Sequence, residues 1–350
     1  MKILVIGPSW IGDMMMSHSL YRTLKAQYPE AIIDVMAPAW CRPLLSRMPV
    51  VNEAIPMPLE HGVLKITERR KIGHSLRNKG YDHAYVLPNS FKSALVPFFA
   101  GIPHRIGWRG EMRYGLLNDI RVLDKKAWPL MVDRYVALAY DKKMMRCAKD
   151  LPQLFLWPQL QVNDSEKCQI CNAFAFSSER LMIAFCPGAE FGPAKRWPHY
   201  HYATLAKNLI DEGYQILLFG SEKVYKVGNQ ILAMLSIEQR AWCRNIAGKT
   251  NLEQAVILIS ACTAVVTNDS GLMHIAAALN RPLIALYGPS SPNFTPPLSP
   301  HHKTCVIRLI TGYRKVRRGD AVDGYHHSLI DIAPQQVLEK LNDLLLNAEG

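Results

Sequence analysis

Short apolar runs alternate with amphipathic segments through the first half of the chain. The apolar runs that predict buried strands are Lys2–Gly7, Ala31–Ala37, Ala54–Met57 and Tyr81–Leu87. Helical patterns lie between and after these runs, at Asp13–Tyr28, at Leu64–Lys79 and in a short apolar segment from Ser90. Strands that alternate with helices form parallel sheets covered by helices on both faces. The pattern therefore predicts an α/β fold.

The same alternation returns after Leu151–Ser178, a segment with prolines and paired serines that predicts a linker. Strands are expected at Met182–Cys186, at Gln215–Phe219, from Ala264 and from Pro282, and helices at Tyr200–Glu212, from Glu222 to about Leu235, at Asn251–Ala261 and at Pro334–Leu346. We therefore expect two Rossmann-like domains, residues 1–160 and 161–330. Residues 331–350 are expected to form a helix that packs back on the first domain.

The composition fits a globular chain with acidic partners. Its 350 residues include 41 Lys+Arg against 29 Asp+Glu, a net charge of +12. Nucleic acid, anionic lipid and phosphorylated small molecules all suit such a charge. The N-terminal apolar stretch is too short for a signal peptide, and no apolar run approaches the roughly 18 residues of a membrane span. We therefore expect a soluble cytoplasmic protein.

The cysteines give no sign of a disulfide framework or a metal site. The chain has 8 of them, scattered in a way that fits reduced thiols. Cys168 and Cys171 form a lone CxxC pair. A structural zinc site needs four ligands, so this pair alone does not predict one.

The most informative segment is Ala264–Ala278, in which an apolar run ends in Thr-Asn-Asp-Ser-Gly and a helical pattern starts at once. In open α/β sheets, ligands bind at the carboxyl ends of strands, where amide N–H groups at a helix N-terminus attract anions. Asp269, Ser270, Gly271 and His274 are therefore candidates for binding a nucleotide sugar. The alternatives are that Asp269 or Ser270 only caps the helix and that His274 only packs in the core.

Acidic residues follow two other predicted strands. Asp13 ends the turn that begins at Gly7, and it either caps the first helix or acts as a general base toward a hydroxyl group. Glu222 follows Phe219-Gly-Ser, and it either accepts hydrogen bonds from ribose hydroxyls or satisfies the helix dipole. Both residues are candidates because each is placed at the carboxyl edge of its sheet.

The loop Pro187–Pro198 is rich in glycine and proline and carries two adjacent cations, Lys195 and Arg196. Two cations beside a helix N-terminus suit a diphosphate, and Gly188 lets the backbone come close to it. Either cation alone also fits a solvated surface. The chain has neither G-x-G-x-x-G nor a P-loop, which disfavours a dinucleotide cofactor and a P-loop ATPase.

Basic side chains in the first half are candidates for holding an acidic acceptor. Those we single out are Lys92, Arg105, Arg109 and Arg113. A phosphorylated acceptor at an anionic membrane surface accounts for their charge, and so does an ordinary solvated surface. Nucleic acid is not the expected partner, because no nucleic-acid motif accompanies the charge.

Several of these motifs together resemble glycosyltransferase family 9, which includes the bacterial lipopolysaccharide heptosyltransferases. The residues that carry the resemblance are Gly12-Asp13, Lys195–Pro198, Asn268–His274 and Tyr287–Pro289. It runs nearly the full length of the chain. The resemblance implies a GT-B fold, with two Rossmann-like domains facing across a cleft, the acceptor in the first and the donor in the second.

The resemblance also implies an inverting transfer of L-glycero-D-manno-heptose from ADP-heptose to the first heptose of the lipopolysaccharide inner core. The acceptor would be a lipid A–Kdo–heptose core, so the enzyme would lie peripherally at the inner face of the inner membrane. By position, Asp13 would be the base, Lys195 would hold the leaving diphosphate and Glu222 the ribose. Asp269 would lie near the heptose, and Gly271 and His274 at the phosphate end.

The loop before Lys195 departs from the family pattern, and the sequence shows no acidic motif for a metal. Some relatives carry threonines just before the lysine, whereas this chain has Glu190–Ala194, so backbone N–H groups would replace hydroxyl contacts to the phosphates. No acidic D-x-D pair follows a predicted strand, and Lys195 and Arg196 can offset the charge of the leaving ADP. We therefore expect no metal, cofactor or protein partner.

Other functions remain possible from the sequence. A transferase of the same family could act on a different core position, of the I or III type. A nucleotide-sugar epimerase would rearrange its donor without an acceptor. A nucleotide-binding or RNA-binding module would use the positive charge without catalysis.

Overall fold

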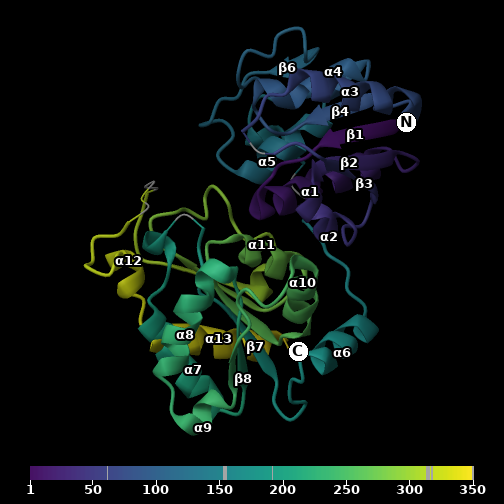
Figure 1. Cartoon of the computed structure of the whole chain (residues 1–350). Helices are drawn as coiled ribbons and strands as arrows, with labels where there is room; N and C mark the ends of the chain where they lie inside the picture. Colours follow the sequence, from purple (N-terminus) through teal and green to yellow (C-terminus); the bar gives the residue numbers. More distant parts are fainter. Residues whose placement is uncertain (61, 153–155, 191, 313–315, 317, 349–350) are drawn as a thin grey trace. The chain divides into compact units, whose positions relative to one another are not determined.

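The computed structural model describes residues 1–60, 62–152, 156–190, 192–312, 316 and 318–348. The chain divides into two compact units, Met1–Leu160 and Gln161–Gly350, at the boundary that the sequence predicts. Each unit is built around a six-stranded sheet whose paired strands are all parallel (Figure 1). The expected α/β class is therefore confirmed.

The sheet of the first unit has the strand order β3-β2-β1-β4-β5-β6. Its strands are β1 (Lys2–Ile6), β2 (Ile32–Pro38), β3 (Val51–Met57), β4 (His83–Val86), β5 (His104–Trp108) and β6 (Asp119–Arg121). The last two were not predicted, because their charged residues and Gly107 hide the apolar pattern of a buried strand.

Helices cover this sheet and pack on one another in pairs. They are α1 (Ile11–Gln27), α2 (Arg42–Leu45), α3 (Ile66–Leu76), α4 (Leu95–Phe99) and α5 (Met131–Val136), with short 3₁₀ turns at Ala39–Cys41, Arg77–Lys79, Phe91–Ala94, Ala137–Ala139 and Ala148–Asp150. Helix α1 packs against α5, and α3 against α4. The first pairing brings α5 to the turn after β1, where Asp13 lies.

The sheet of the second unit has the order β12-β11-β10-β7-β8-β9. Its strands are β7 (Met182–Cys186), β8 (Gln215–Leu218), β9 (Cys243–Asn245), β10 (Ala264–Asn268), β11 (Leu283–Tyr287) and β12 (Thr304–Arg308). Alternate side chains of these strands enter one core, as Ile183 and Phe185 of β7 show. Such burial on both faces is typical of a parallel sheet.

Helices pack on both faces of the second sheet (Figure 1). The helices of this unit are α6 (Asp164–Ala173), α7 (His199–Asp211), α8 (Tyr225–Ala233), α9 (Ile237–Arg240), α10 (Leu252–Ala261), α11 (Gly271–Ala278), α12 (His327–Ile330) and α13 (Pro334–Ala348), with 3₁₀ turns at Pro193–Lys195, Glu222–Val224 and His301–Lys303. Helix α6 lies inside the segment predicted as a linker. A capping box between Asn163 and Glu166 starts it, and it packs on α10.

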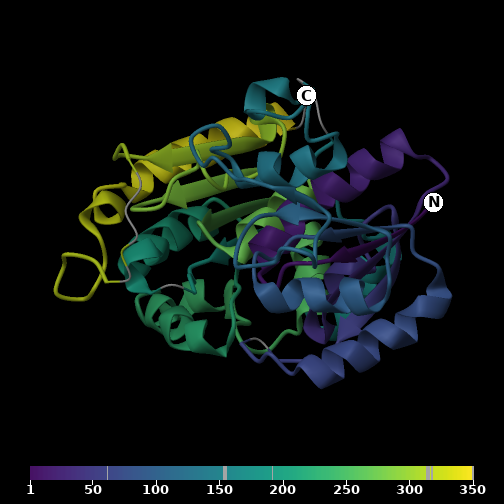
Figure 2. The same cartoon turned by 90° about the horizontal axis from the view of Figure 1, so that it is seen from above.

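The C-terminal helix α13 belongs to the second unit, so the expectation that it packs on the first domain is wrong. Val337, Leu338, Leu341 and Leu344 share the core formed by α7 and the strands of the second sheet. Figure 2 shows this helix, in yellow, running beside the last strands, with which it makes contacts. The spacing of these four residues of α13 places their side chains on one face of the helix, and that face is buried in the core of the second unit.

Both sheets have the same topology, and this fixes where ligands are expected. In each unit the chain places its second and third strands on one side of the first strand and then crosses to the other side. The fourth strand therefore pairs with the first, β4 with β1 and β10 with β7. Ligands of open α/β sheets bind at such a reversal of strand order, outside the carboxyl ends of the strands. Asp13 follows β1, and the loop with Lys195 follows β7, so both lie at these positions.

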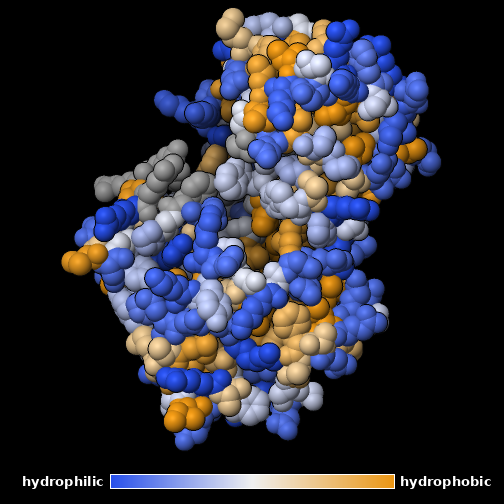
Figure 3. Space-filling view, viewed as in Figure 1, coloured by the Kyte–Doolittle hydropathy of each residue, from blue (hydrophilic) through white to orange (hydrophobic). Residues whose placement is uncertain are grey.

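Polar side chains cover most of the face seen in Figure 3, with apolar side chains in small groups among them. Among the helices in the described ranges, none is both long and apolar enough to cross a membrane. Exposed apolar side chains include Trp10, Met112 and Tyr114 of the first unit.

The placement of α13 can be tested by two leucines of this helix. Leu341 is fully buried, whereas the side chain of Leu346 is 73% exposed. We predict that Leu341→Ala lowers the free energy of unfolding of the second unit by about 2–5 kcal/mol, because it leaves a cavity in the core. Leu346→Ala should change it by less than about 0.5 kcal/mol. Urea unfolding followed by tryptophan fluorescence measures both, and equal effects would contradict the packing described here.

Candidate active site

Residues from β7 and β10 meet at the reversal of strand order in the second unit. The Nζ atom of Lys195, in the loop after β7, lies 2.8 Å from Oδ2 of Asp269, in the turn after β10. The side chains of Lys195 and Asp269 are 20% and 9% exposed. Two residues singled out from separate motifs therefore form one partly shielded ion pair. Such a pair is stronger than one fully in water.

The N-terminus of α11 lies beside this ion pair. Ser270 holds the N-cap position, but its side chain makes no capping hydrogen bond to the described residues. Its hydroxyl instead lies 3.4 Å from that of Thr267. The carboxylate of Asp269 faces Lys195. The capping role considered for these two residues is therefore not what the structure shows, and the first turn of α11 keeps its partial positive charge.

His274 is buried on α11 close enough to Asp269 and Lys195 to feel both charges. Burial lowers the pKa of His274 to about 4, and the opposing effect of Asp269 does not restore it. The imidazole is therefore neutral at neutral pH. It therefore adds no charge beside the ion pair.

Glu222 lies at the same edge of the sheet, in the turn after β8, and its side chain is exposed. Gly188 and Gly220 let this turn close on the loop after β7. A Cβ atom on Gly188 would come 2.6 Å from Cγ2 of Val224, and one on Gly220 would come 2.6 Å from its Cβ. Gly188 is therefore needed for close packing beside Glu222.

Arg196 stabilises the loop in which it lies. Its Nη2 atom donates a hydrogen bond of 3.2 Å to the carbonyl oxygen of Ala189. Of the two adjacent cations, Lys195 faces the turn after β10, whereas Arg196 braces the loop that carries them both.

In the first unit, Asp13 is the third residue of α1, and Trp10 holds the N-cap position. Asp13 therefore does not occupy the N-cap. The hydroxyl of Tyr135, on α5, donates a hydrogen bond of 3.3 Å to its Oδ1. Burial raises the pKa of Asp13, and the Tyr135 hydrogen bond opposes this in part. A carboxylate with a raised pKa is a better proton acceptor, which suits a general base.

Two of the four basic candidates in the first unit bind backbone carbonyl groups of the protein itself. Arg113 is fully buried, and it donates to the carbonyl oxygens of Pro88 (2.6 Å) and Trp108. Burial lowers its pKa to about 10, so it stays charged. Arg105 donates to the carbonyl oxygens of Leu116 and Ile102, at 2.6 Å each. Both guanidinium groups therefore hold loops of the protein together, and the buried Arg113 presents no charge at the surface.

The other two basic candidates lie at the expected edge of the first sheet. Lys92 is half-buried in the 3₁₀ turn after β4, and Arg109 is exposed directly after β5. Because β4 lies next to β1, their positions follow neighbouring strands of the sheet that also carries Asp13. They remain candidates for contact with an acidic acceptor.

Sequence reasoning missed two residues that shape these sites. Tyr135 had no signal, because it lies 122 positions from Asp13 along the chain. Asn268 was visible within the quoted motif, but only the structure shows that it is fully buried and bonded to the loop after β7.

One group in the described ranges has the composition of a metal site, formed by Asp320, His326 and His327. His327 is paired with Asp320, and Nδ1 of His326 lies 2.7 Å from the hydroxyl of Ser328. In this structure these side chains therefore bind one another and Ser328. The CxxC cysteines are free thiols on α6.

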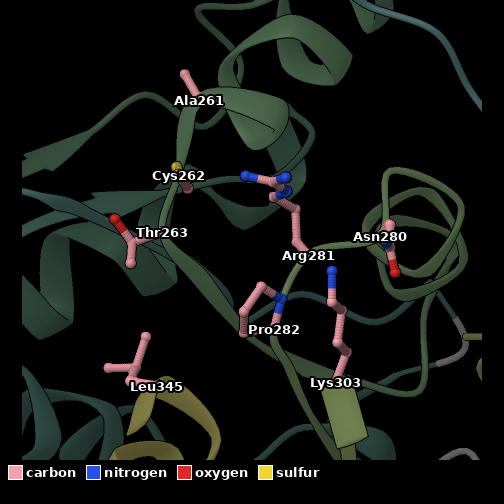
Figure 4. A pocket seen from close by; sticks show the side chains of 8 residues that line it. All are labelled: Ala261, Cys262, Thr263, Asn280, Arg281, Pro282, Lys303 and Leu345. Atoms are coloured by element: carbon pink, nitrogen blue, oxygen red, sulfur yellow. The ribbon is translucent and has the colours of Figure 1, made fainter. Parts of the chain in front are cut away.

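A cavity of about 290 Å³ opens at the opposite edge of the second sheet (Figure 4). Thr263, Pro282 and Lys303, which line it, immediately precede β10, β11 and β12. The candidate site residues lie at the carboxyl ends of these strands or of their neighbours. The cavity is therefore separate from the candidate site.

Comparison with known proteins gives a consistent result. The profile of "Glycosyltransferase family 9 (heptosyltransferase)" matches residues 69–326. The chain is 78% identical, over 100% of both chains, to lipopolysaccharide heptosyltransferase 2 of Escherichia coli. It is also similar to a solved Escherichia coli ADP-heptose LPS heptosyltransferase II, with 74% identity, 100% coverage of both chains and a TM-score of 0.92. The GT-B fold is thereby confirmed.

A more distant solved structure supports the fold alone. It is a family 9 glycosyltransferase from Veillonella parvula, 20% identical, with 99% of this chain and 97% of that chain covered and a TM-score of 0.82.

The link between Tyr135 and Asp13 predicts a measurable change. Because the hydrogen bond stabilises the ionised carboxyl group, Tyr135→Phe should raise the pKa of Asp13 further. Titration of the labelled Asp13 carboxyl carbon by NMR measures this, with Asp13→Asn used to assign the signal. An unchanged or lowered pKa in the variant would show that Tyr135 does not stabilise the carboxylate.

Proposed function

Since the chain belongs to glycosyltransferase family 9, we propose that this glycosyltransferase moves L-glycero-D-manno-heptose from ADP-heptose to the first heptose of the lipopolysaccharide inner core. The observation that carries the donor assignment is the contact between Lys195 and Asp269 at the β7/β10 reversal, beside the N-terminus of α11. A cation and a helix N-terminus together suit a diphosphate. The high identity to curated heptosyltransferases supports the choice of sugar.

In this proposal the donor binds along the carboxyl edge of the second sheet. Lys195 and the first turn of α11, at Ser270 and Gly271, hold the diphosphate, and His274 supports them from behind. Glu222 accepts hydrogen bonds from the ribose hydroxyls, and Asp269 lies near the heptose. Gly188 and Arg196 shape the loop that brings Lys195 to the phosphates.

The reaction is a single displacement. Asp13 takes the proton of the acceptor hydroxyl while the hydroxyl oxygen forms a bond to the anomeric carbon of the donor heptose. The bond from that carbon to the phosphate oxygen breaks, and ADP leaves with the electron pair. Attack opposite the leaving group inverts the configuration. Lys195 and the α11 N-terminus stabilise the charge that develops on the diphosphate.

We propose that the first unit binds the acceptor, with Lys92 and Arg109 near its acidic groups. The acceptor is anchored in lipid, and a net charge of +12 favours the anionic surface of the inner membrane, where the enzyme would lie peripherally at the inner face.

No metal is part of this mechanism. Rigorous chelation should therefore leave turnover unchanged, and loss of activity restored by Mg²⁺ would contradict that point.

The acceptor specificity is tested by turnover of ADP-heptose with core acceptors that carry zero, one or two heptoses. Product from the one-heptose acceptor alone supports the proposal. Product from the acceptor without heptose, or only from the one with two, would indicate the runner-up, a family member acting on a different core position. Conversion of the donor without any acceptor would indicate an epimerase, and binding without turnover a nucleotide-binding module.

The role of Asp13 gives a direct prediction. Asp13→Asn should lower kcat by about 10²–10⁴-fold, because it removes general-base catalysis, while the Kd for ADP stays unchanged. Steady-state kinetics and calorimetry measure the two effects. Glu68→Gln is the matched control, because Glu68 is an exposed acid in the first turn of α3 of the same unit. The role of base is refuted if both variants keep full activity or if Asp13→Asn acts through ADP binding.

A further inference from the structure

Asn268, the last residue of β10, is fully buried and uses both ends of its side-chain amide. Its Oδ1 accepts a hydrogen bond of 2.9 Å from the backbone N–H of Trp197 and one of 3.3 Å from the hydroxyl of Tyr202. Its Nδ2 donates to the carbonyl oxygens of Gly188, at 3.3 Å, and Cys186, at 3.5 Å. One side chain therefore joins β10 to the end of β7 and to the loop that follows it.

The two loop residues bound by Asn268 lie near opposite ends of the loop Pro187–Pro198. Gly188 is its second residue, and Trp197 is its last but one. Trp197 is itself immobilised, because its ring is fully buried and its Nε1 donates a hydrogen bond of 2.9 Å to the carbonyl oxygen of Ile332. Its ring also packs edge-on against that of Tyr202, with centroids 4.8 Å apart. Both ends of the loop are thus fixed to β10 and the core.

Lys195 and Arg196 lie within this loop, immediately before Trp197, and Asp269 follows Asn268 in the chain. The hydrogen bonds of the Asn268 amide to this loop therefore fix the distance between Lys195 and the turn after β10. We propose that Asn268 is a positioning residue, which holds Lys195 at the height of the α11 N-terminus so that both reach the donor diphosphate. This inference rests on the proposed function, since it names how its donor site is built.

The chemistry of the amide explains why asparagine occupies this position. Only a side chain with both an acceptor and a donor satisfies the N–H of Trp197 and the carbonyl of Gly188 together. Alanine leaves both groups without their partner in a buried place. Aspartate keeps an acceptor for Trp197, but it offers no donor to Gly188 and adds a second carboxylate beside Asp269 that competes for Lys195.

The test compares two probes, ADP and adenosine, by calorimetry. In Asn268→Ala, the Kd for ADP should rise about tenfold or more, whereas the Kd for adenosine, which has no phosphate to meet Lys195, should change less than about twofold. Asn268→Asp should weaken ADP binding at least as much, which provides a second variant if the first does not fold. A merely structural role would weaken both probes alike or neither, and either result would overturn the inference.

Two further variants distinguish this inference from the proposed donor site on which it rests. Asn245→Ala is the matched control, because Asn245 is also a buried asparagine of this unit, with its Nδ2 bonded to the carbonyl oxygen of Tyr225 at 3.0 Å. It should lower stability without changing the Kd for ADP. In a Lys195→Ala background, Asn268→Ala should add less than about threefold, because the cation that it positions is gone.

The outcomes are distinguishable. If Lys195→Ala leaves ADP binding unchanged, the proposed donor site is wrong and the positioning role falls with it. If Lys195→Ala weakens ADP binding but the two losses simply multiply, the donor site stands and the inference alone is overturned.

Discussion

The ion pair between Lys195 and Asp269 is the interaction on which the account of this protein depends. It forms where the strand order of the second sheet reverses, so that the loop after β7 and the turn after β10 come together. Lys195 is held close to the N-terminus of α11 by a carboxylate rather than by packing alone. Under the proposed function, a diphosphate that binds there would exchange one anionic partner of Lys195 for another, so the charge of Lys195 would stay compensated.

The two units use one topology for opposite electrostatic tasks. In the first, the first turn of α1, the helix that follows β1, carries the Asp13 carboxyl group, whose pKa is raised by burial and partly lowered again by the Tyr135 hydrogen bond. In the second, the loop after β7 supplies cations, and the turn after β10 leads into the N-terminus of α11, the helix that also carries the buried, neutral His274. In the proposed mechanism, the first group is the proton acceptor and the second holds the leaving anion, the two tasks that an inverting displacement requires. Placing them on separate sheets lets each environment be tuned without disturbing the other.

Much of the fold and of the site follows from sequence because the apolar pattern is strong where strands are fully buried. Strands β1, β7 and β10 carry the candidate residues at their ends, and each reads as a continuous apolar run. Strand β5 was missed because His104, Arg105 and Gly107 break that pattern. Helix α13 was assigned to the wrong unit because periodicity identifies an apolar face but not the surface that buries it.

The contacts of the site residues that sequence does not give have a related cause. Sequence gives the charge of Arg113 but not the place where its long side chain ends, and it ends on backbone carbonyl groups in the core. Asn268 and Tyr135 act through contacts with residues distant in sequence, which no local pattern reports. Local motifs therefore locate the edge of the sheet where chemistry occurs, whereas the partners that orient those motifs come only from the folded chain.

A crystal structure of the protein with bound ADP tests the central claim most directly. The account predicts that the diphosphate lies at the N-terminus of α11, with Nζ of Lys195 within hydrogen-bond distance of a phosphate oxygen and the ribose beside Glu222. ADP bound at another edge of the sheet, with the Lys195–Asp269 pair unchanged and no phosphate near it, would contradict the account.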